Sequence, residues 1–235
     1  MKTFLKILSL LLVALSIVAG GLFFFYGDEM DGAEFWESTI EAYEAEDAAR
    51  FPDKGLILFT GSSSIRLWST LEADMAPLRV LNRGFGGAHM DHVVHFADRI
   101  IAPYAARAIV VYAGDNDIGA GKSPETVEAD FRALVAKVRE DQPTVPIYYL
   151  TIKASRLRWK LWSSMLEANR LIGAIAAEHP GIHIIDVSTP MIDRGRGGKP
   201  PRELFLFDGL HLSAEGYALW ASIVREHLLA DLGTR

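Results

Sequence analysis

The chain has 235 residues, of which 50% are hydrophobic and 23% charged, a globular composition long enough for one sizeable core. Its 24 basic and 30 acidic residues give a formal charge of −6, and no predicted helix carries a basic stripe, so a nucleic-acid partner is not expected. The absence of cysteine excludes disulfides, thiolate metal sites and a cysteine nucleophile.

The first feature along the chain is an apolar segment. Residues 7–26, ILSLLLVALSIVAGGLFFFY, carry no charge and have about the length of a helix that crosses a bilayer. Lys2 and Lys6 precede this segment, so the positive-inside rule places the N-terminus in the cytoplasm. We therefore predict one N-terminal transmembrane helix, with residues 1–27 as a membrane anchor and residues 28–235 as an extracytoplasmic domain, periplasmic or at the cell surface.

A cleaved signal peptide is the alternative for this segment, and it would make the protein secreted. The apolar region of a signal peptide usually spans only about 7 to 15 residues and ends in a small-x-small site. Val18 and Gly20 form a weak site of this kind, and Leu22 to Tyr26 continue the apolar run beyond it. The sequence therefore favours the uncleaved anchor.

Helical and strand patterns alternate along the rest of the chain. Residues 33–50, rich in Glu and Ala, predict a helix. Five β-branched or aromatic runs predict strands: LILFT (56–60), VLNRGF (80–85), AIVVYAG (108–114), PIYYLTI (146–152) and IHIIDV (182–187). This alternation predicts one α/β domain with a parallel five-stranded sheet covered on both faces, in which ligands bind beyond the carboxyl ends of the strands.

The clearest helical patterns are at 123–141 and 213–229. In the first, Ser123 suits the N-cap, Pro124 the first helical position and Glu125 the positive end of the helix dipole. The residues expected on its buried face are Val127, Phe131, Leu134, Val135 and Val138.

Four loops carry the residues that could perform chemistry. They read GSSSI (61–65), NRGFGG (82–87), GDND (114–117) and DGLH (208–211). Each has an ordinary explanation, because serines cap helices and Gly, Asn and Asp make turns. Their joint placement at predicted strand ends or just before a helix favours a single site.

These loops contain the groups that acyl transfer by serine requires. Asp208 and His211 are three residues apart, so the carboxylate can meet one ring nitrogen while the other nitrogen faces the serines. Gly87 lets its backbone N–H approach a ligand, and the Asn116 side chain supplies an NH₂ donor for an oxyanion. These residues predict nucleophilic catalysis with an oxyanion hole.

The four loops, in this order, resemble the SGNH/GDSL hydrolase superfamily, whose blocks usually read GDSIT, NxGxxG, GxND and DxxH. Trp68 also stands where many members have tryptophan. The resemblance implies a flavodoxin-like three-layer α/β/α fold and a serine esterase mechanism. It assigns Ser63 as nucleophile with Asp208 and His211, and an oxyanion hole to the backbone of Ser63, Gly87 and the Asn116 side chain.

One position departs from the superfamily pattern. Ser62 replaces the usual aspartate before the nucleophile, which leaves Ser62 and Ser64 as rival nucleophiles. That aspartate does not orient the histidine, so its loss need not disable the enzyme. The sequence has no GxSxG motif, which disfavours the α/β-hydrolase fold.

Neither a cofactor nor a metal is predicted. His89, His92 and His95 follow the glycine loop in a predicted helix, where a spacing of three turns them progressively around the helix. The role of this segment stays open, as do those of Arg66 and of the loop 194–202. That loop and the segment 153–160 could border the cleft and accept an anionic or sugar substrate, with Trp159 and Trp162 as stacking surfaces.

The sequence thus predicts a serine ester hydrolase that acts on a small-molecule or glycan ester. The favoured reaction removes short, acetyl-like groups from an envelope or carbohydrate substrate. A lysophospholipase or thioesterase is the alternative, as is a catalytically silent membrane-anchored binding protein, because fold analogy does not select among them. The simultaneous presence of a serine, a histidine, an aspartate and an asparagine favours the enzyme.

The anchor prediction can be tested by cell fractionation. Full-length protein should sediment with membranes, resist extraction by salt or alkali, and be cleaved by added protease only from the extracytoplasmic side. Processing near residue 20 would instead show a signal peptide.

Overall fold

The computed structural model describes residues 32–234. The chain divides into two compact units, Met1–Glu41 and Ala42–Arg235. The predicted transmembrane helix and the predicted boundary after residue 27 lie outside the described residues. Within residues 32–234, no helix is both long and apolar enough to cross a membrane.

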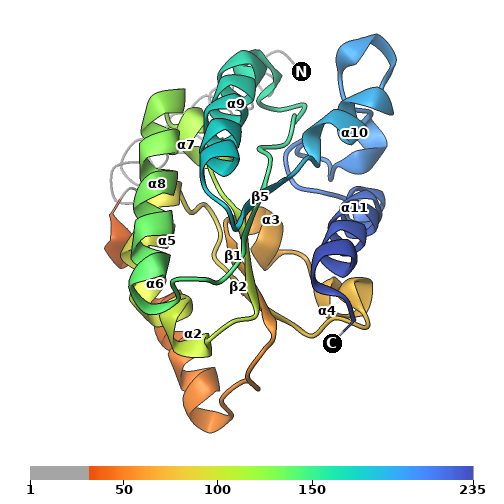
Figure 1. Cartoon of the computed structure of the whole chain (residues 1–235). Coiled ribbons are helices and arrows are strands. Elements are labelled where there is room, and N and C mark those ends of the chain that lie inside the picture. The colour runs from red at the N-terminus through yellow and green to blue at the C-terminus, as the bar shows by residue number, and fades with distance from the viewer. Residues whose placement is uncertain (1–31, 235) are drawn as a thin grey trace, which may run out of the picture. The chain divides into compact units, whose positions relative to one another are not determined.

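The second unit is built on a five-stranded parallel sheet with the strand order β2, β1, β3, β4, β5 (Figure 1). The strands are β1 (Ile57–Gly61), β2 (Val80–Gly84), β3 (Ala108–Tyr112), β4 (Ile147–Leu150) and β5 (Ile182–Ile185). All five predicted strands are confirmed. Every residue of β1, β3 and β4 is buried, as expected for continuous apolar runs in a sheet covered on both faces.

Helices cover both faces of the sheet (Figure 1). One layer contains α5 (Met90–His95), α6 (Ala97–Ile100), α8 (Pro124–Asp141) and α9 (Trp162–Glu178), and the other contains α4 (Leu71–Met75), α10 (Ser188–Asp193) and α11 (Ala214–Leu232). Two short helices, α3 (Ser63–Arg66) and α7 (Asp115–Gly119), follow β1 and β3. The strand order and the three layers confirm the predicted flavodoxin-like α/β/α architecture.

The remaining elements are short or lie near the start of the described chain. They are the 3₁₀ helices η1 (Ala33–Trp36), η2 (Ala102–Tyr104), η3 (Trp159–Leu161), η4 (Arg196–Gly198) and η5 (Arg202–Leu204), and the helix α2 (Glu37–Ala49). The predicted helix over 33–50 is therefore a 3₁₀ turn followed by an α-helix.

Helix α8 begins as its sequence predicts. Ser123 is the N-cap, and its hydroxyl accepts a hydrogen bond from the backbone N–H of Thr126 at 3.2 Å. The buried residues are Val127, Phe131, Leu134 and Val138. Val135, which was expected on the same face, is only half-buried, because a rotation of about 100° per residue carries it to the edge of that face.

An aromatic cluster packs between the sheet and α11. Trp68 lies within 6.0 Å of Phe59 and 5.4 Å of Tyr217, measured between ring centroids, and the Trp220 ring packs against it edge-on. Each such pair stabilises the fold by about 0.5–1.5 kcal/mol beyond burial. Because Trp68 follows α3 almost directly, this cluster fixes the end of the helix whose first residue is Ser63.

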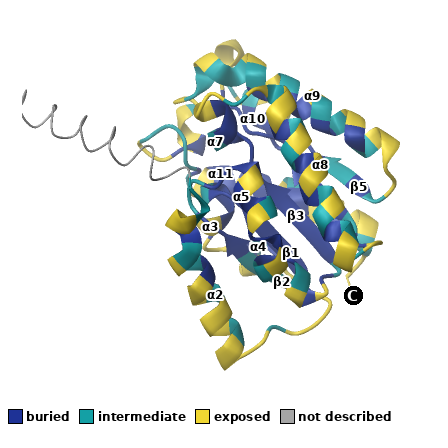
Figure 2. Ribbon diagram, turned by 90° about the vertical axis from the view of Figure 1, so that its left-hand side faces the viewer, coloured by how far each residue is buried: buried dark blue, intermediate teal, exposed yellow. Residues whose placement is uncertain are grey.

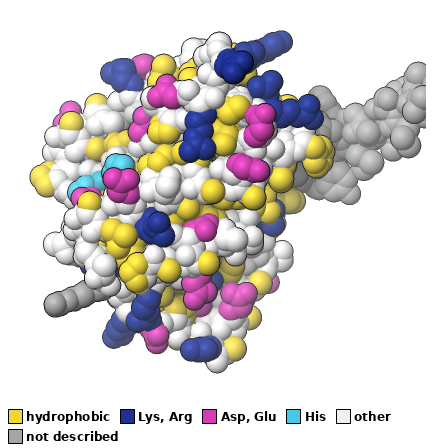
Figure 3. Space-filling model, turned by 90° about the vertical axis from the view of Figure 1, so that its right-hand side faces the viewer, with side chains coloured by type: hydrophobic (Ala, Val, Ile, Leu, Met, Phe, Trp, Pro, Cys, Tyr) yellow, Lys and Arg dark blue, Asp and Glu magenta, His cyan; other side chains and the backbone are white. Residues whose placement is uncertain are grey.

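The pattern of burial agrees with the three layers. Figure 2 shows the inner strands β1 and β3 buried and the edge strand β5 partly buried, while the helices alternate between buried and exposed residues along their length. The face in Figure 3 carries basic, acidic and hydrophobic side chains interspersed.

Candidate active site

The turn between β1 and α3 presents Ser63. Gly61 has a φ of 123°, and a Cβ at this position would lie 1.9 Å from the carbonyl oxygen of Tyr112 on the neighbouring strand. Only glycine allows this approach. The backbone N–H of Ser62 then donates to the same Tyr112 oxygen at 2.9 Å, so the chain turns at the strand end and Ser63 becomes the first residue of α3.

The structure brings Ser63, His211 and Asp208 into one chain of hydrogen bonds. The distance from His211 Nε2 to Ser63 Oγ is 3.0 Å, and the distance from His211 Nδ1 to Asp208 Oδ2 is 2.6 Å. Asp208 and His211 come from the loop before α11, and all three side chains are partly buried.

The Asp208 carboxylate is fixed by several donors. Its Oδ1 accepts hydrogen bonds from the backbone N–H groups of Leu210 at 2.8 Å and of His211 at 3.0 Å. Burial opposes ionisation, but the hydrogen bonds from the His211 ring and these two N–H groups outweigh it and lower the pKa of Asp208. An ionised Asp208 only accepts, so His211 Nδ1 carries the proton and Nε2 is left to accept from Ser63.

The two rival serines occupy different environments. Ser62 and Ser64 are both buried, whereas Ser63 is half-buried. The Ser64 hydroxyl has no hydrogen-bond partner among the described residues. Of the three serines, Ser63 is the one whose hydroxyl lies within hydrogen-bond distance of the His211 ring.

Hydrogen bonds join the loops that carry the predicted oxyanion donors. The backbone N–H of Phe85 donates to the carbonyl oxygen of Gly61 at 2.8 Å, which ties the glycine loop to the serine loop. Gly87 has a φ of 80°, in the left-handed region that glycine tolerates. Asn116 Nδ2 donates to the carbonyl oxygen of Ala88 at 3.0 Å, so Asn116 lies beside the residue that follows Gly87.

Asp117 strengthens the connection between these two loops. Its side chain is completely buried, and its carboxylate accepts the backbone N–H of Met90 at 3.0 and 3.2 Å. The Lys122 ammonium lies 3.3 Å from the same carboxylate. The last residue of the GDND motif therefore holds the segment after Gly87 against α7.

Beside Asn116, the structure shows a second polar group that the sequence did not predict: Asp115 with Lys153 and Arg158. Lys153 Nζ lies 2.7 Å from Asp115 Oδ2, and Arg158 Nη1 lies 2.6 Å from Asp115 Oδ1. Burial would raise the pKa of Asp115, but these two cations, together with hydrogen bonds from Lys153 and Tyr112, lower it. The sequence suggested that the segment 153–160 could accept an anionic substrate; Lys153 is instead buried and paired with Asp115.

One sequence signal could have identified this group. Lys153 directly follows the apolar run PIYYLTI, and a lysine in such a position needs a carboxylate if it is buried. Asp115 lies at the end of the neighbouring predicted strand.

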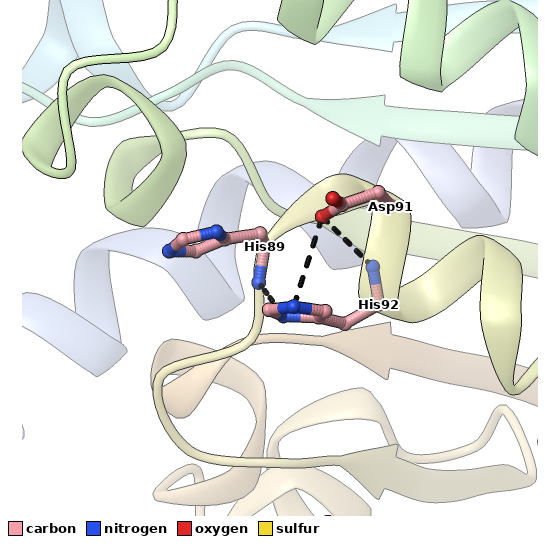
Figure 4. A group of neighbouring side chains, drawn as sticks. All are labelled: His89, Asp91 and His92. Atoms are coloured by element: carbon pink, nitrogen blue, oxygen red, sulfur yellow. Dashed lines mark hydrogen bonds and ion pairs between the residues drawn. The ribbon is translucent and has the colours of Figure 1, made fainter. Parts of the chain in front are cut away.

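The histidine segment forms a cluster that differs from the prediction (Figure 4). His89 and His92 were expected to diverge around a helix, but their rings stack with centroids 4.8 Å apart. The reason is that His89 is the N-cap of α5, so its non-helical backbone allows the ring to lie over His92. His95 lies apart and packs on Phe96.

His89, Asp91 and His92 could offer ligand atoms within 4.8 Å of one another. Two of these three side chains already have partners, because the backbone N–H of His89 donates to His92 Nδ1 at 3.1 Å and Lys122 Nζ lies 2.8 Å from Asp91 Oδ1. The same ammonium lies 3.6 Å from Asp130. Lys122 thus holds the position that a cation would take among these carboxylates. Burial, reinforced by His92 and Lys122 and opposed by Asp117, lowers the pKa of His89.

The two basic stretches singled out in the sequence lie beside each other. The Arg156 guanidinium donates to the carbonyl oxygen of Pro200 at 3.0 Å, and Lys199 Nζ lies 5.5 Å from the centroid of the Trp159 ring. The backbone N–H of Leu157 donates to the carbonyl oxygen of Gly209 at 3.0 Å, next to Asp208. The stretch 153–160 therefore adjoins the loop that carries Asp208 and His211, and the loop 194–202 packs against that stretch.

Solved structures with this fold come from several bacteria. A protein from Streptococcus pneumonia, provisionally described as a platelet activating factor, is 19% identical with a TM-score of 0.73 over 92% of this chain and 98% of its own. A GDSL-like lipase from Bacteroides thetaiotaomicron is 16% identical with a TM-score of 0.68 over 82% and 98%. An acetyl xylan esterase is 14% identical with a TM-score of 0.60 over 73% and 98%. At these identities the likeness establishes the fold.

The family itself is established at the level of sequence. No curated protein matches the chain significantly. The model of the GDSL-like Lipase/Acylhydrolase family matches residues 52–219, a stretch that contains all four loops predicted to carry the chemistry. The chain therefore belongs to the GDSL-like lipase/acylhydrolase family.

Proposed function

We propose that this protein is a serine ester hydrolase in which Ser63 is the nucleophile, His211 the general base and Asp208 the residue that orients the base. The observation that carries the proposal is the chain of hydrogen bonds from Ser63 through His211 to Asp208, at 3.0 and 2.6 Å. Membership of a lipase/acylhydrolase family supports it.

The geometry suggests the following reaction. His211 Nε2 accepts the Ser63 proton as Oγ attacks the ester carbonyl carbon, and the carbonyl oxygen becomes an oxyanion. The backbone N–H groups of Ser63 and Gly87 and the Asn116 NH₂ group donate to it. Collapse of the intermediate passes the proton from His211 to the departing alcohol oxygen and leaves an acyl ester on Ser63. Water, deprotonated by His211, then attacks this ester; the bond between the acyl carbon and Ser63 Oγ breaks, His211 returns the proton to Oγ, and the carboxylic acid is released.

We further propose that the preferred acyl group is short. The glycine-rich loops at the strand ends leave little sequence for a large apolar lid or an acyl tunnel. An acetyl xylan esterase shares the fold, which makes an acetylated carbohydrate a reasonable substrate class. With residues 7–26 as the proposed anchor, such a domain would meet envelope sugars outside the cytoplasmic membrane.

One observation favours a second candidate, an enzyme for longer acyl chains. Phe207, directly before Asp208, is 94% exposed, and Leu206 beside it is 46% exposed. Leu157, whose backbone bonds to Gly209, is also exposed. Exposed apolar groups next to a site can receive an apolar ligand, so a lysophospholipase or thioesterase stays a rival proposal.

The nucleophile can be tested with a fluorophosphonate probe. Ser63→Ala should abolish labelling and lower kcat by roughly 10⁴-fold or more, because a serine hydrolase loses its nucleophile. Ser62→Ala is the matched control and should still label. Labelling that persists in the Ser63→Ala protein would contradict the assignment.

With His211 as the general base, the pH profile of kcat/KM should have one limb, a fall on the acid side. Activity should fall as the pH is lowered from 9 toward 5, because a protonated imidazole cannot accept the Ser63 proton. Asp208, with its lowered pKa, stays ionised in that range and adds no second limb. The measurement is kcat/KM from pH 5 to 9. A flat profile, or activity that survives His211→Ala, would exclude this mechanism.

The acyl preference can be measured with nitrophenyl esters of increasing chain length. Each methylene that finds no pocket forfeits up to about 0.8 kcal/mol of burial, so kcat/KM should gain little from C2 to C8. A kcat/KM that climbs steadily from C2 to C12 would reject the acetylesterase proposal and favour the long-chain rival. Phe207→Ser would then be expected to remove much of that gain.

A further inference from the structure

The orientation of the Asn116 side chain is determined by its two partners. Arg158 Nη1 donates to Asn116 Oδ1 at 2.9 Å, and Asn116 Nδ2 donates to the carbonyl oxygen of Ala88 at 3.0 Å. A guanidinium only donates and a carbonyl only accepts, so the amide cannot be flipped without losing both bonds. One Nδ2 hydrogen is used by Ala88, and the other is left for a substrate oxygen.

Arg158 is itself held in place. Besides Asn116 Oδ1, its Nη1 contacts the Asp115 carboxylate at 2.6 Å and the Asp115 carbonyl oxygen at 3.0 Å, so the two N–H groups of Nη1 are shared among three acceptor oxygens. The other oxygen of the carboxylate accepts from Lys153, which also bonds to the Tyr112 hydroxyl at 3.0 Å. Asp115 and Lys153 are buried, so this arrangement is rigid compared with a surface ion pair.

The same arrangement carries an excess of positive charge. Two cations, Lys153 and Arg158, face the single carboxylate of Asp115. Charges shielded from water act more strongly on their neighbours than exposed charges do. A cation bonded to the amide oxygen of Asn116 draws electron density from the amide and makes its N–H groups better donors.

We propose that Arg158, fixed by Asp115, is a positioning residue that orients and polarises Asn116 as an oxyanion donor. The inference rests on the proposed function, because it requires an oxyanion to form at Ser63. In this proposal the buried Asp115 and Lys153 also serve catalysis, because Lys153 holds Asp115, Asp115 holds the Arg158 guanidinium, and the guanidinium orients Asn116.

Gly119 provides a way to move this guanidinium without removing any polar group. A Cβ on Gly119 would lie 2.9 Å from Arg158 Nε and Cζ, so Gly119→Ala must displace the end of the arginine side chain. Gly119 ends α7 and does not have a positive φ, so alanine fits its backbone. Gly173→Ala in α9 is the matched control, because a Cβ there has no atom within 4 Å.

The test compares the steady-state hydrolysis of 4-nitrophenyl acetate by the full-length chain and its variants. Loss of an oxyanion-hole donor typically lowers kcat by about 10²- to 10³-fold. Arg158→Met leaves Asn116 in place but removes the hydrogen bond that orients it, so kcat should fall by a smaller factor, about 10- to 100-fold. KM should change by less than about twofold, since the interaction acts in the transition state. Gly119→Ala should lower kcat in the same way, and Gly173→Ala should not.

A double-mutant comparison separates positioning from other roles. In an Asn116→Ala background, Arg158→Met should cost less than about twofold in kcat, because the group that it positions is gone. An equal loss in both backgrounds, an effect confined to KM, or full activity of Gly119→Ala would overturn the proposal. If Arg158→Met does not fold, as judged by circular dichroism, Gly119→Ala decides alone. Activity that survives Ser63→Ala would instead reject the proposed function.

Discussion

The 3.0 Å hydrogen bond between His211 Nε2 and Ser63 Oγ joins residues that are 148 positions apart, and the rest of the site depends on it. A parallel sheet makes this contact possible, because the carboxyl ends of its strands lie along one edge. Ser63 follows β1, an inner strand of the sheet, and β1 has β2 and β3 as neighbours. The loops after these three strands therefore meet, while the loop before α11 supplies the histidine.

Two carboxylates in the site are kept ionised by different means. Asp208 is partly exposed and is held by hydrogen bonds from the His211 ring and two backbone N–H groups. Asp115 is buried, where burial alone would raise its pKa, and the cations of Lys153 and Arg158 lower it instead. In the proposed mechanism the first carboxylate serves the base and the second serves the oxyanion donor. The two halves of the site thus depend on separate electrostatic networks.

The sequence predicted what local patterns determine. The apolar runs predicted the five strands, and the Ser-Pro pair predicted the N-cap of α8. The four loops predicted the family that the family model matches. It did not predict contacts that depend on long-range packing. The pairing of Lys153 with Asp115 crosses from β4 to β3, and the stacking of His89 on His92 depends on where α5 begins.

The most direct test of the proposed mechanism is the structure of the protein inactivated by a fluorophosphonate, whose phosphoryl oxygen stands in for the oxyanion. We expect phosphorus bonded to Ser63 Oγ, and the phosphoryl oxygen within about 2.7–3.1 Å of the backbone nitrogens of Ser63 and Gly87 and of Asn116 Nδ2. An adduct on another residue, or a phosphoryl oxygen that contacts none of these three donors, would contradict the mechanism.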